Sequence, residues 1–432
     1  MQLLFSRKFF PLFGMQFCGS FNDNFFKYAF IIIITIKTAS VFSIPYEQII
    51  ALTATVFTIP YLFFSTFAGI FADKFAKSKL LIWIKFFEIA IMLVAAYAFI
   101  TNNLELLLIV IFFMGTQTTF FGPVRYGLLP EIVGEKQLIL GNALIQVSRF
   151  ASSLLGIIFA GVLVKASNSE NGEIAVAIVV VVAGTLGYII SLYQYPTIPQ
   201  NSNLKISFNI FKSFSEAIKV AHSDHIIFIS VLGISWFWFY SISILSIIPI
   251  YVHDTLKANQ TVLTLILTIF IVAVSVGCFS CHIFSKYGKN SLRLVSIGAI
   301  GVFIFTTDIY FQGNFSILNT SIAGSIDIIK IVSYPFVIRV IIDLIFIAFF
   351  SGIYSIPLFA LIQQRTNKNY LSRVIAANDL INAFFIMISG GILYVAFKNG
   401  YSSIHIFALT SVGTLLQGTW MFWYFNKNHK II

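Results

Sequence analysis

Four polar side chains interrupt a long apolar stretch near the amino terminus. Asn22, Asp23, Asn24 and Lys27 lie inside a run that extends from residue 9 to residue 34. Asp23 and Lys27 are four positions apart, so on a helix they share one face and can form an ion pair. An ionised side chain at the centre of a lipid bilayer costs about 3 kcal/mol or more, and it usually faces an interior cavity. The spacing predicts a candidate binding site on one helix, with Lys27 as the resting partner of Asp23; the alternative is an ion pair that only locks this helix against a neighbour.

Further polar residues mark other apolar runs. Arg125 follows Gly122 and Pro123, and its guanidinium is well shaped for bidentate contact with a phosphate, although an anchor at the membrane surface is equally consistent with its position. Two other groups have helical spacing or fall at matching places in the two halves of the chain: Asn142, Gln146 and Arg149, and Asn378 and Asp379. For these five the alternative role is hydrogen bonding between helices, worth about 0.6 kcal/mol on average.

The composition identifies the solvent that must surround these residues. Of the 432 residues, 58% are hydrophobic and only 10% are charged, and the mean hydropathy is +0.93. An average soluble domain is about one quarter charged. The apolar runs approach the roughly 20 residues needed to span a bilayer, and they do not alternate as barrel strands do. We therefore predict an all-α polytopic membrane protein and exclude nucleic acid as a partner, because the net charge of +11 lies between apolar runs and not on a soluble face.

The run lengths predict twelve transmembrane helices in two bundles of six. We expect a first domain at residues 1–195, a linker with an amphipathic helix at 196–223 and a second domain at 224–432. With the amino terminus inside, 18 of the 27 Lys and Arg residues fall in inner segments and six in outer ones. The positive-inside rule then places both termini in the cytoplasm. The predicted spans lie near 9–36, 48–72, 80–100, 104–124, 141–164, 174–195, 224–250, 260–284, 291–311, 336–360, 374–397 and 401–425.

The two halves of the chain repeat each other, as in transporters built from parallel repeats. Residues 71–78 after the second span match residues 283–290 after the eighth, and residues 142–146 match residues 378–382. The chain resembles the major facilitator superfamily here, whose loop between the second and third spans carries a gating motif. The residues that match this motif are Gly69, Asp73, Lys74 and Lys77, with Ala76 in place of the usual glycine.

Three longer stretches resemble the lysophospholipid transporter family within that superfamily. They are residues 21–27, residues 120–130 and residues 374–379, and the segment 234–239 is similar to the branch fused to an acyltransferase and acyl-carrier-protein synthetase. The resemblance implies movement of lysophospholipids, chiefly lyso-phosphatidylethanolamine, from the outer to the inner leaflet of a bacterial inner membrane for re-acylation. In that role Asp23 would meet the ammonium or hydroxyls of the head group, and a separate acyltransferase or acyl-carrier-protein synthetase would be a partner.

Two other functions remain open at this stage. One is a general major facilitator exporter of drugs or other amphiphiles, and the other is a membrane subunit that docks a separate acyltransferase. We expect no enzymatic activity, no cofactor, no metal and a monomer.

Several remaining features have a structural interpretation. Arg339 and Asp343, at i and i+4, and Lys85 and Glu88, at i and i+3, are expected to form structural ion pairs. The stretch from Cys278 to His282 fits a haem attachment pattern, but it lies inside an apolar run, so we expect its small residues to pack helices together.

Overall fold

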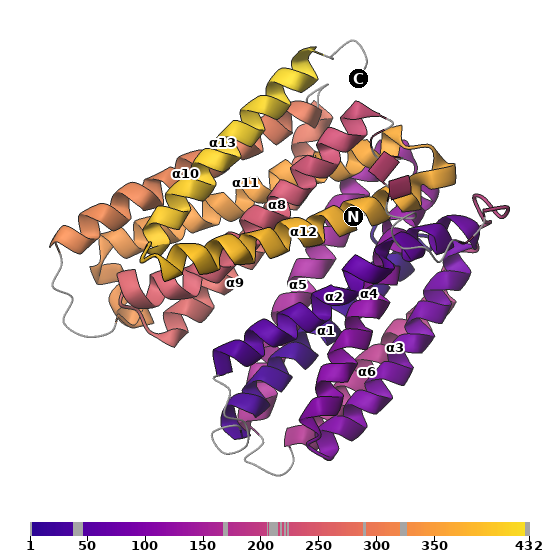
Figure 1. The fold of residues 1–432 in the computed structure, drawn as a ribbon, viewed down its shortest axis with the longest axis horizontal. Coiled ribbons are helices and arrows are strands. Elements are labelled where there is room, and N and C mark those ends of the chain that lie inside the picture. Colours follow the sequence, from indigo (N-terminus) through magenta and orange to yellow (C-terminus); the bar gives the residue numbers. More distant parts are fainter. Residues whose placement is uncertain are drawn as a thin grey trace. The chain divides into compact units, whose positions relative to one another are not determined.

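The computed structural model describes residues 2–37, 46–166, 172–204, 206, 215–216, 218–219, 222, 224–287, 291–319 and 326–427. Within these residues, twelve α-helices of 21 to 31 residues account for nearly all of the chain (Figure 1). Their bounds are α1 (Phe10–Lys37), α2 (Tyr46–Lys74), α3 (Lys77–Ile100), α4 (Leu104–Val133), α5 (Leu138–Ala166), α6 (Gly172–Leu192), α8 (His225–Ile250), α9 (Gln260–Tyr287), α10 (Ser291–Asn319), α11 (Pro335–Arg365), α12 (Leu371–Lys398) and α13 (Ser403–Lys427).

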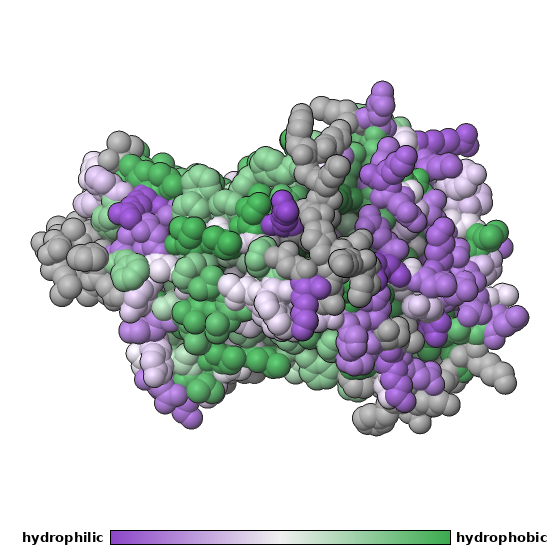
Figure 2. Space-filling view, turned by 90° about the horizontal axis from the view of Figure 1, so that it is seen from above, coloured by the Kyte–Doolittle hydropathy of each residue, from purple (hydrophilic) through white to green (hydrophobic). Residues whose placement is uncertain are grey.

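The helices have the length and the apolar surface that a lipid environment requires. Ten of those in the described part are long and apolar enough to cross a membrane. Large apolar side chains lie exposed on their surfaces, among them Trp83, Val162 and Leu416. Figure 2 shows a broad band of hydrophobic side chains across the visible face, with hydrophilic side chains gathered toward its ends. A band of this kind is the surface that a hydrocarbon core requires, and the predicted fold class is confirmed.

By internal contacts the first unit comprises Met1–Asp224 together with Gln363–Leu380. In this unit α1 packs against α5 and α6, α2 against α4, and α3 against α4 and α6 (Figure 1). Gly156 of α5 allows the close approach to α1, because a Cβ at that position would lie 2.6 Å from the carbonyl oxygen of Phe21. Small residues at helix crossings are the usual means of packing in membranes, where lipid removes the hydrophobic driving force between helices.

The second unit comprises His225–Ile362 and Ile381–Ile432. In this unit α13 packs against α10 and α8, and α8 is joined to α12 by hydrogen bonds of 2.8 Å from Ser235 to Asn382 and between Ser243 and Ser389. Cys278 and Cys281 are free thiols that are fully buried. A Cβ at Gly352 of α11 would lie 2.6 Å from the backbone nitrogen of Cys278. The surroundings of these cysteines agree with a packing role.

The observed helix bounds agree with the predicted spans within a few residues, with two main exceptions. The span expected at 104–124 continues to Val133 as α4, and the span expected at 291–311 continues to Asn319 as α10. Pro123 and Pro130 lie inside α4 and do not end it. A helix in lipid continues past a proline because ending it would leave several backbone groups without partners. Most of the amphipathic helix expected at 196–223 falls outside the described residues.

Candidate functional site

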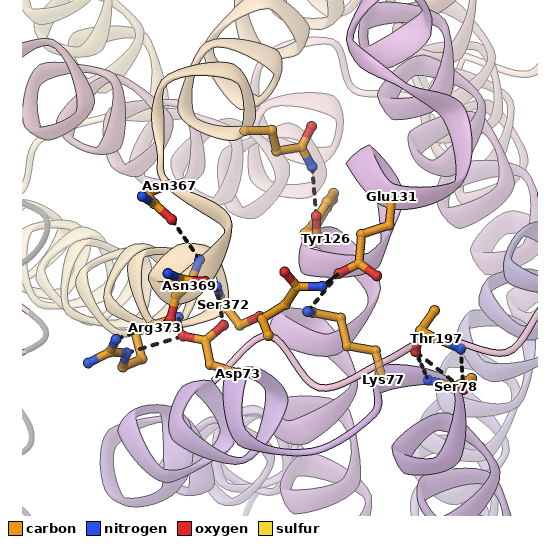
Figure 3. A network of polar contacts seen from close by, with 12 residues as sticks. Asp73, Lys77, Ser78, Tyr126, Glu131, Thr197, Asn367, Asn369, Ser372 and Arg373 are labelled. Carbon is orange, nitrogen blue, oxygen red and sulfur yellow. Dashed lines mark hydrogen bonds and ion pairs between the residues drawn. The ribbon is translucent and has the colours of Figure 1, made fainter. Parts of the chain in front are cut away.

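A latch joins Asp73, at the end of α2, to the start of α12. The Asp73 side chain is fully buried, and its carboxylate accepts hydrogen bonds from the backbone N–H groups of Ser372 at 3.0 Å and Arg373 at 3.3 Å. The Arg373 guanidinium adds an ion pair of 3.1 Å (Figure 3). The first N–H groups of a helix have no intrahelical acceptor and carry a partial positive charge. Asp73 therefore caps α12 from a distant part of the sequence, entirely within the first unit.

The glycine of the gating motif makes this contact possible. A Cβ at Gly69 would lie 2.7 Å from the Cβ of Ala376 and 2.9 Å from the Cα of Arg373. Gly127 of α4 is constrained in the same way, because its Cβ would lie 2.5 Å from the Ser372 hydroxyl. No side chain larger than hydrogen fits between α2, α4 and the start of α12 without a shift. Lys74, also predicted from the motif, lies with its ammonium 5.9 Å from the Phe75 ring and takes no ion-pair role among the described residues.

The helix α4 supports the latch from the other side. Lys77, 1% exposed, pairs with Glu131 at 2.8 Å. The Gln363 side chain at the end of α11 donates to the carbonyl oxygen of Tyr126 at 3.0 Å and accepts from Asn142 of α5 at 2.6 Å. Asn142, which the sequence suggested as a substrate ligand, thus helps to hold Gln363 beside α4. We include this contact and the Lys77–Glu131 pair in the latch. The stretch 120–130 therefore serves as the surface on which Gln363–Leu380 is held.

The segment after α6 is attached to the same region. Thr197 and Ser78 exchange hydrogen bonds of 3.0 and 3.1 Å through backbone and hydroxyl groups, and the backbone N–H of Asn201 donates to the Asp73 carbonyl at 2.9 Å. Gln200 adds a weaker contact to Glu131 at 3.3 Å. The start of the linker is thereby fixed to the loop that carries the gating motif.

A second group of charges lies deeper in the first unit. Asp23 of α1 accepts from the Thr118 hydroxyl at 3.2 Å, and the Lys27 ammonium lies 4.0 Å from the centre of the Phe57 ring. Lys27 and Asp23 interact electrostatically. The direct ion pair expected between them is, however, not among the salt bridges of the described residues. Each side chain instead makes its direct contact with a neighbouring helix, Asp23 with α4 and Lys27 with α2.

Arg125 also lies within this group and is buried among the helices. Because α4 continues past Pro123, Arg125 sits inside the helix and is only 7% exposed. Its guanidinium donates to the Gln16 side chain and lies 4.2 Å from the centre of the Tyr126 ring. The prediction that it ends the fourth span was wrong, and burial disfavours the anchor interpretation.

The remaining charges complete the cluster. The Asp379 carboxylate would be 2.8 Å from a Cβ at Gly122, and it interacts electrostatically with Arg125 and Arg149. The Tyr61 hydroxyl of α2 interacts electrostatically with charged groups on four other helices, namely Asp379, Arg149, Asp23 and Arg125. We call these residues, with Lys27, the charged cluster: Asp23, Lys27, Tyr61, Arg125, Arg149 and Asp379. It holds three cations and two carboxylates.

The predicted amides divide into two kinds. Asn24 donates to Ser20 at 2.8 Å and to the Ser153 hydroxyl of α5 at 2.9 Å, so it joins two helices. Asn22 and Gln146 are at most 1% exposed, and neither of their polar atoms has a hydrogen-bond partner within the described part of the chain. The carbonyl oxygen of the buried Asn378 side chain likewise has no hydrogen-bond partner among the described residues. Such groups are costly to bury unpaired, so these three remain candidates for contact with a ligand.

Of the two ion pairs that the sequence predicted to be structural, one is present and the other is not. Lys85 and Glu88 pair at 2.6 Å, both at most 4% exposed, and the prediction is confirmed. Arg339 instead pairs with Asp308 of α10 at 2.6 Å, so the expected pair with Asp343 was wrong. A carboxylate on the facing helix gives the guanidinium a bidentate partner, which the i,i+4 position does not provide here.

Tyr61, Gln16, Phe57 and Thr118 were not found from the sequence. Tyr61 lies one position after Pro60 in an apolar run, and the other three are single residues without a recognisable spacing. Only the packing of α2 and α4 against α1 shows that they face the charged residues. Pro60, inside α2 and next to Tyr61, is the one feature of the sequence that could have drawn attention to this position.

Twelve long apolar helices in the described part of the chain, with the loop after α2 in contact with the start of α12, are typical of a membrane transporter. The family model of the Major Facilitator Superfamily matches residues 12–391, and the chain belongs to this superfamily. The structure of the transporter FucP in the outward conformation aligns with a TM-score of 0.70 at 13% identity, covering 96% of this chain and 98% of that chain. A bacterial homologue of the iron transporter ferroportin in an outward-facing state gives 0.69 at 14% identity, with 96% and 99% coverage. These similarities show the shared fold.

Within the superfamily the chain is similar to lysophospholipid transporters over most of its length. The protein named Lysophospholipid transporter LplT of Yersinia enterocolitica is 25% identical over 407 residues, which cover 92% of this chain and 89% of the relative. The protein of the same name from Cronobacter sakazakii is 21% identical over 403 residues, with coverage of 91% and 90%. The resemblance noted in the sequence is thereby confirmed.

Proposed function

We propose that this transporter carries lysophospholipids, chiefly lyso-phosphatidylethanolamine, from the outer to the inner leaflet of a bacterial inner membrane, where a separate acyltransferase re-acylates them. The observation that carries the proposal is the charged cluster. A head group of this kind has one phosphate and one ammonium, and the cluster offers cations for the first and carboxylates for the second. The names of the relatives support the same cargo.

Each of the five charged residues of the cluster has a role in this proposal. Arg125 and Arg149 bind the phosphate, because guanidinium groups match its oxygens and are always charged. Asp23 binds the ammonium, and Lys27, whose ammonium rests against Phe57, moves toward the phosphate when the lipid arrives. Asp379, placed beside Gly122 by the start of α12, links the cluster to the latch.

The latch is the proposed gate. Opening it requires Asp73 to release the N–H groups of Ser372 and Arg373, and Lys77 and Asn142 to change partners. We propose that the protein functions as a monomer with both termini in the cytoplasm. Its first domain would comprise residues 1–195 and its second 224–432, with 196–223 as the cytoplasmic linker.

The test is uptake of labelled lyso-phosphatidylethanolamine by proteoliposomes that contain the purified protein. We expect saturable uptake that phosphate-bearing lysolipids inhibit and that drugs without a phosphate do not. Uptake of amphiphilic drugs with no lysolipid uptake would support a general exporter instead. Co-purification of an acyltransferase without any lipid transfer would support a docking subunit.

A further inference from the structure

A second polar cluster lies in the second unit. It begins with the ion pair between Arg339 of α11 and Asp308 of α10. The guanidinium contacts both carboxylate oxygens of Asp308, with Nε to Oδ2 at 3.0 Å and Nη2 to Oδ1 at 2.6 Å. This bidentate arrangement is the strong form of the pair. Asp343, one turn further along α11, is thereby left without a cation of its own although it is only 3% exposed.

A single amide connects the two carboxyl groups. The Gln312 nitrogen donates to Asp308 Oδ2 at 2.6 Å and to Asp343 Oδ2 at 2.7 Å. Both N–H groups of this amide are therefore used on the carboxyl pair. Gln312 is 9% exposed, and its carbonyl oxygen has no hydrogen-bond partner in the described part of the chain. Asp308 and Asp343 are thus bridged by one nitrogen atom, and the two carboxyl groups interact electrostatically.

The charges of this cluster do not balance if both carboxyl groups are ionised. Two carboxylates against one guanidinium leave one buried negative charge, and two carboxylates that share a site do not both ionise easily. Tyr251, which faces Asp343 from η2 (Tyr251–Thr255), is 1% exposed and brings no positive charge. Two ionised carboxylates can only accept hydrogen bonds, so a bond between them requires one proton.

We propose that Asp308 and Asp343 form a proton-binding site that holds one proton between their carboxyl groups and supplies the coupling ion for transport. The proton reaches the site through Asp308, whose side chain is 28% exposed, and forms an O–H bond on Asp343, which donates it to Asp308. Release returns the proton and restores both carboxylates. The site itself is independent of the cargo, whereas its coupling to transport rests on the proposed function.

The site can be tested without any substrate. Infrared spectra of the purified full-length protein are recorded as a function of pH, in H₂O and in D₂O. We expect a carbonyl band of a protonated carboxyl group that shifts in D₂O and disappears at high pH. Asp343→Asn should remove it, and Asp254→Asn, a change at an exposed carboxylate in η2, should leave it unchanged. A band that persists in Asp343→Asn overturns the proposal.

A second variant covers the case in which Asp343→Asn does not fold. Arg339 is 63% exposed at its side chain, so Arg339→Gln is expected to be tolerated. Without the guanidinium the carboxyl pair loses the cation that contacts it, and the band should persist to higher pH than in the unchanged protein. A band that disappears at the same or a lower pH contradicts a shared proton next to Arg339.

Coupling is tested in proteoliposomes with an imposed gradient. For one proton per lipid, a gradient of one pH unit should change the steady-state accumulation of lyso-phosphatidylethanolamine by up to about tenfold. Its sign tells whether the proton moves with the lipid or against it. Asp343→Asn should abolish this dependence and retain exchange of lipid across the membrane. Dependence on sodium, or on neither ion, overturns the coupling role. If neither the unchanged protein nor any variant takes up lysolipid, the proposed cargo is wrong. The infrared titration still decides whether Asp308 and Asp343 bind a proton.

Discussion

The carboxylate of Asp73 accepts a hydrogen bond of 3.0 Å from the backbone N–H of Ser372, although 299 positions separate the two residues. This bond places the gating motif at the first turn of α12, where the N–H groups would otherwise have no acceptor. It also explains how the Asp73 carboxylate can be fully buried, because the N–H groups of α12 and the Arg373 guanidinium provide its partners. The gating motif therefore acts through the amino terminus of α12. The strength of the contact between Asp73 and this terminus can be measured.

Asp73→Asn should weaken the latch without removing the helix. The amide oxygen can still accept from Ser372, but the negative charge that attracts Arg373 is lost. Hydrogen bonds to a charged group contribute about 1.5 to 3 kcal/mol. We expect the amides of residues 371–374 to exchange hydrogen for deuterium about tenfold faster or more, as measured by mass spectrometry. Equal rates in this peptide would show that Asp73 does not hold it, and a peptide from α8 serves as the reference.

Gly69→Val should separate α2 from α12. Its side chain would overlap Ala376 and Arg373, whose atoms lie within 3.0 Å of the Cβ position. We expect uptake to fall at least tenfold while the protein still reaches the membrane. Gly161→Val is the matched control, because nothing lies within 4 Å of its Cβ position. Similar losses in both variants would mean that the effect is general to valine in these helices.

Arg125→Lys should impair lysolipid binding. A lysine cannot reproduce the planar contact with Tyr126 together with the hydrogen bond to Gln16, and it cannot bind a phosphate with two parallel N–H groups. We expect KM for uptake to rise about tenfold, with protein levels unchanged. Arg7→Lys, at an exposed arginine near the amino terminus, should have no effect. An unchanged KM in Arg125→Lys would remove the phosphate role.

The Lys85–Glu88 pair should matter for stability and not for cargo. Glu88→Gln leaves a lysine that is fully buried without its counter-ion, and breaking such a pair costs about 3 to 5 kcal/mol. The double variant Lys85→Met with Glu88→Gln should recover most of this loss, since no unpaired charge remains and Gln117 keeps its acceptor. Thermal unfolding in detergent measures both. A double variant as unstable as the single one would show that the pair has a further role.

The sequence predicted the helices well because lipid leaves few alternatives. Apolar length alone located α1 to α6 and α8 to α13 within a few residues in most cases. It failed after residue 124, where the apolar run stops but α4 continues through Pro123 and Pro130 to Val133. Arg125 therefore lies inside a helix, where its burial disfavours one of its two predicted roles, the surface anchor.

Side-chain partners were harder to predict than helices. Spacing on one helix correctly paired Lys85 with Glu88, but it also suggested Arg339 with Asp343 and Asp23 with Lys27. In both of these cases the direct contact is made with a facing helix: Asp308 for Arg339, and Thr118 for Asp23. Such contacts depend on the rotation of two helices about their axes, which local periodicity does not determine. Tyr61 was missed for the same reason.

Asp23→Asn should change which head groups are carried. If Asp23 binds the ammonium, the variant loses an attraction that at an effective dielectric constant of 20 amounts to about 4 kcal/mol for charges 4 Å apart, before the cost of desolvation. We expect uptake of lyso-phosphatidylethanolamine to fall about tenfold or more, and uptake of lyso-phosphatidylglycerol, which has no ammonium, to change little. The asparagine keeps an acceptor for Thr118, so the helices should remain packed. Glu105→Gln, the same chemical change at an exposed position of α4, is the control. Equal losses for both lipids would instead assign Asp23 to packing or to proton transfer.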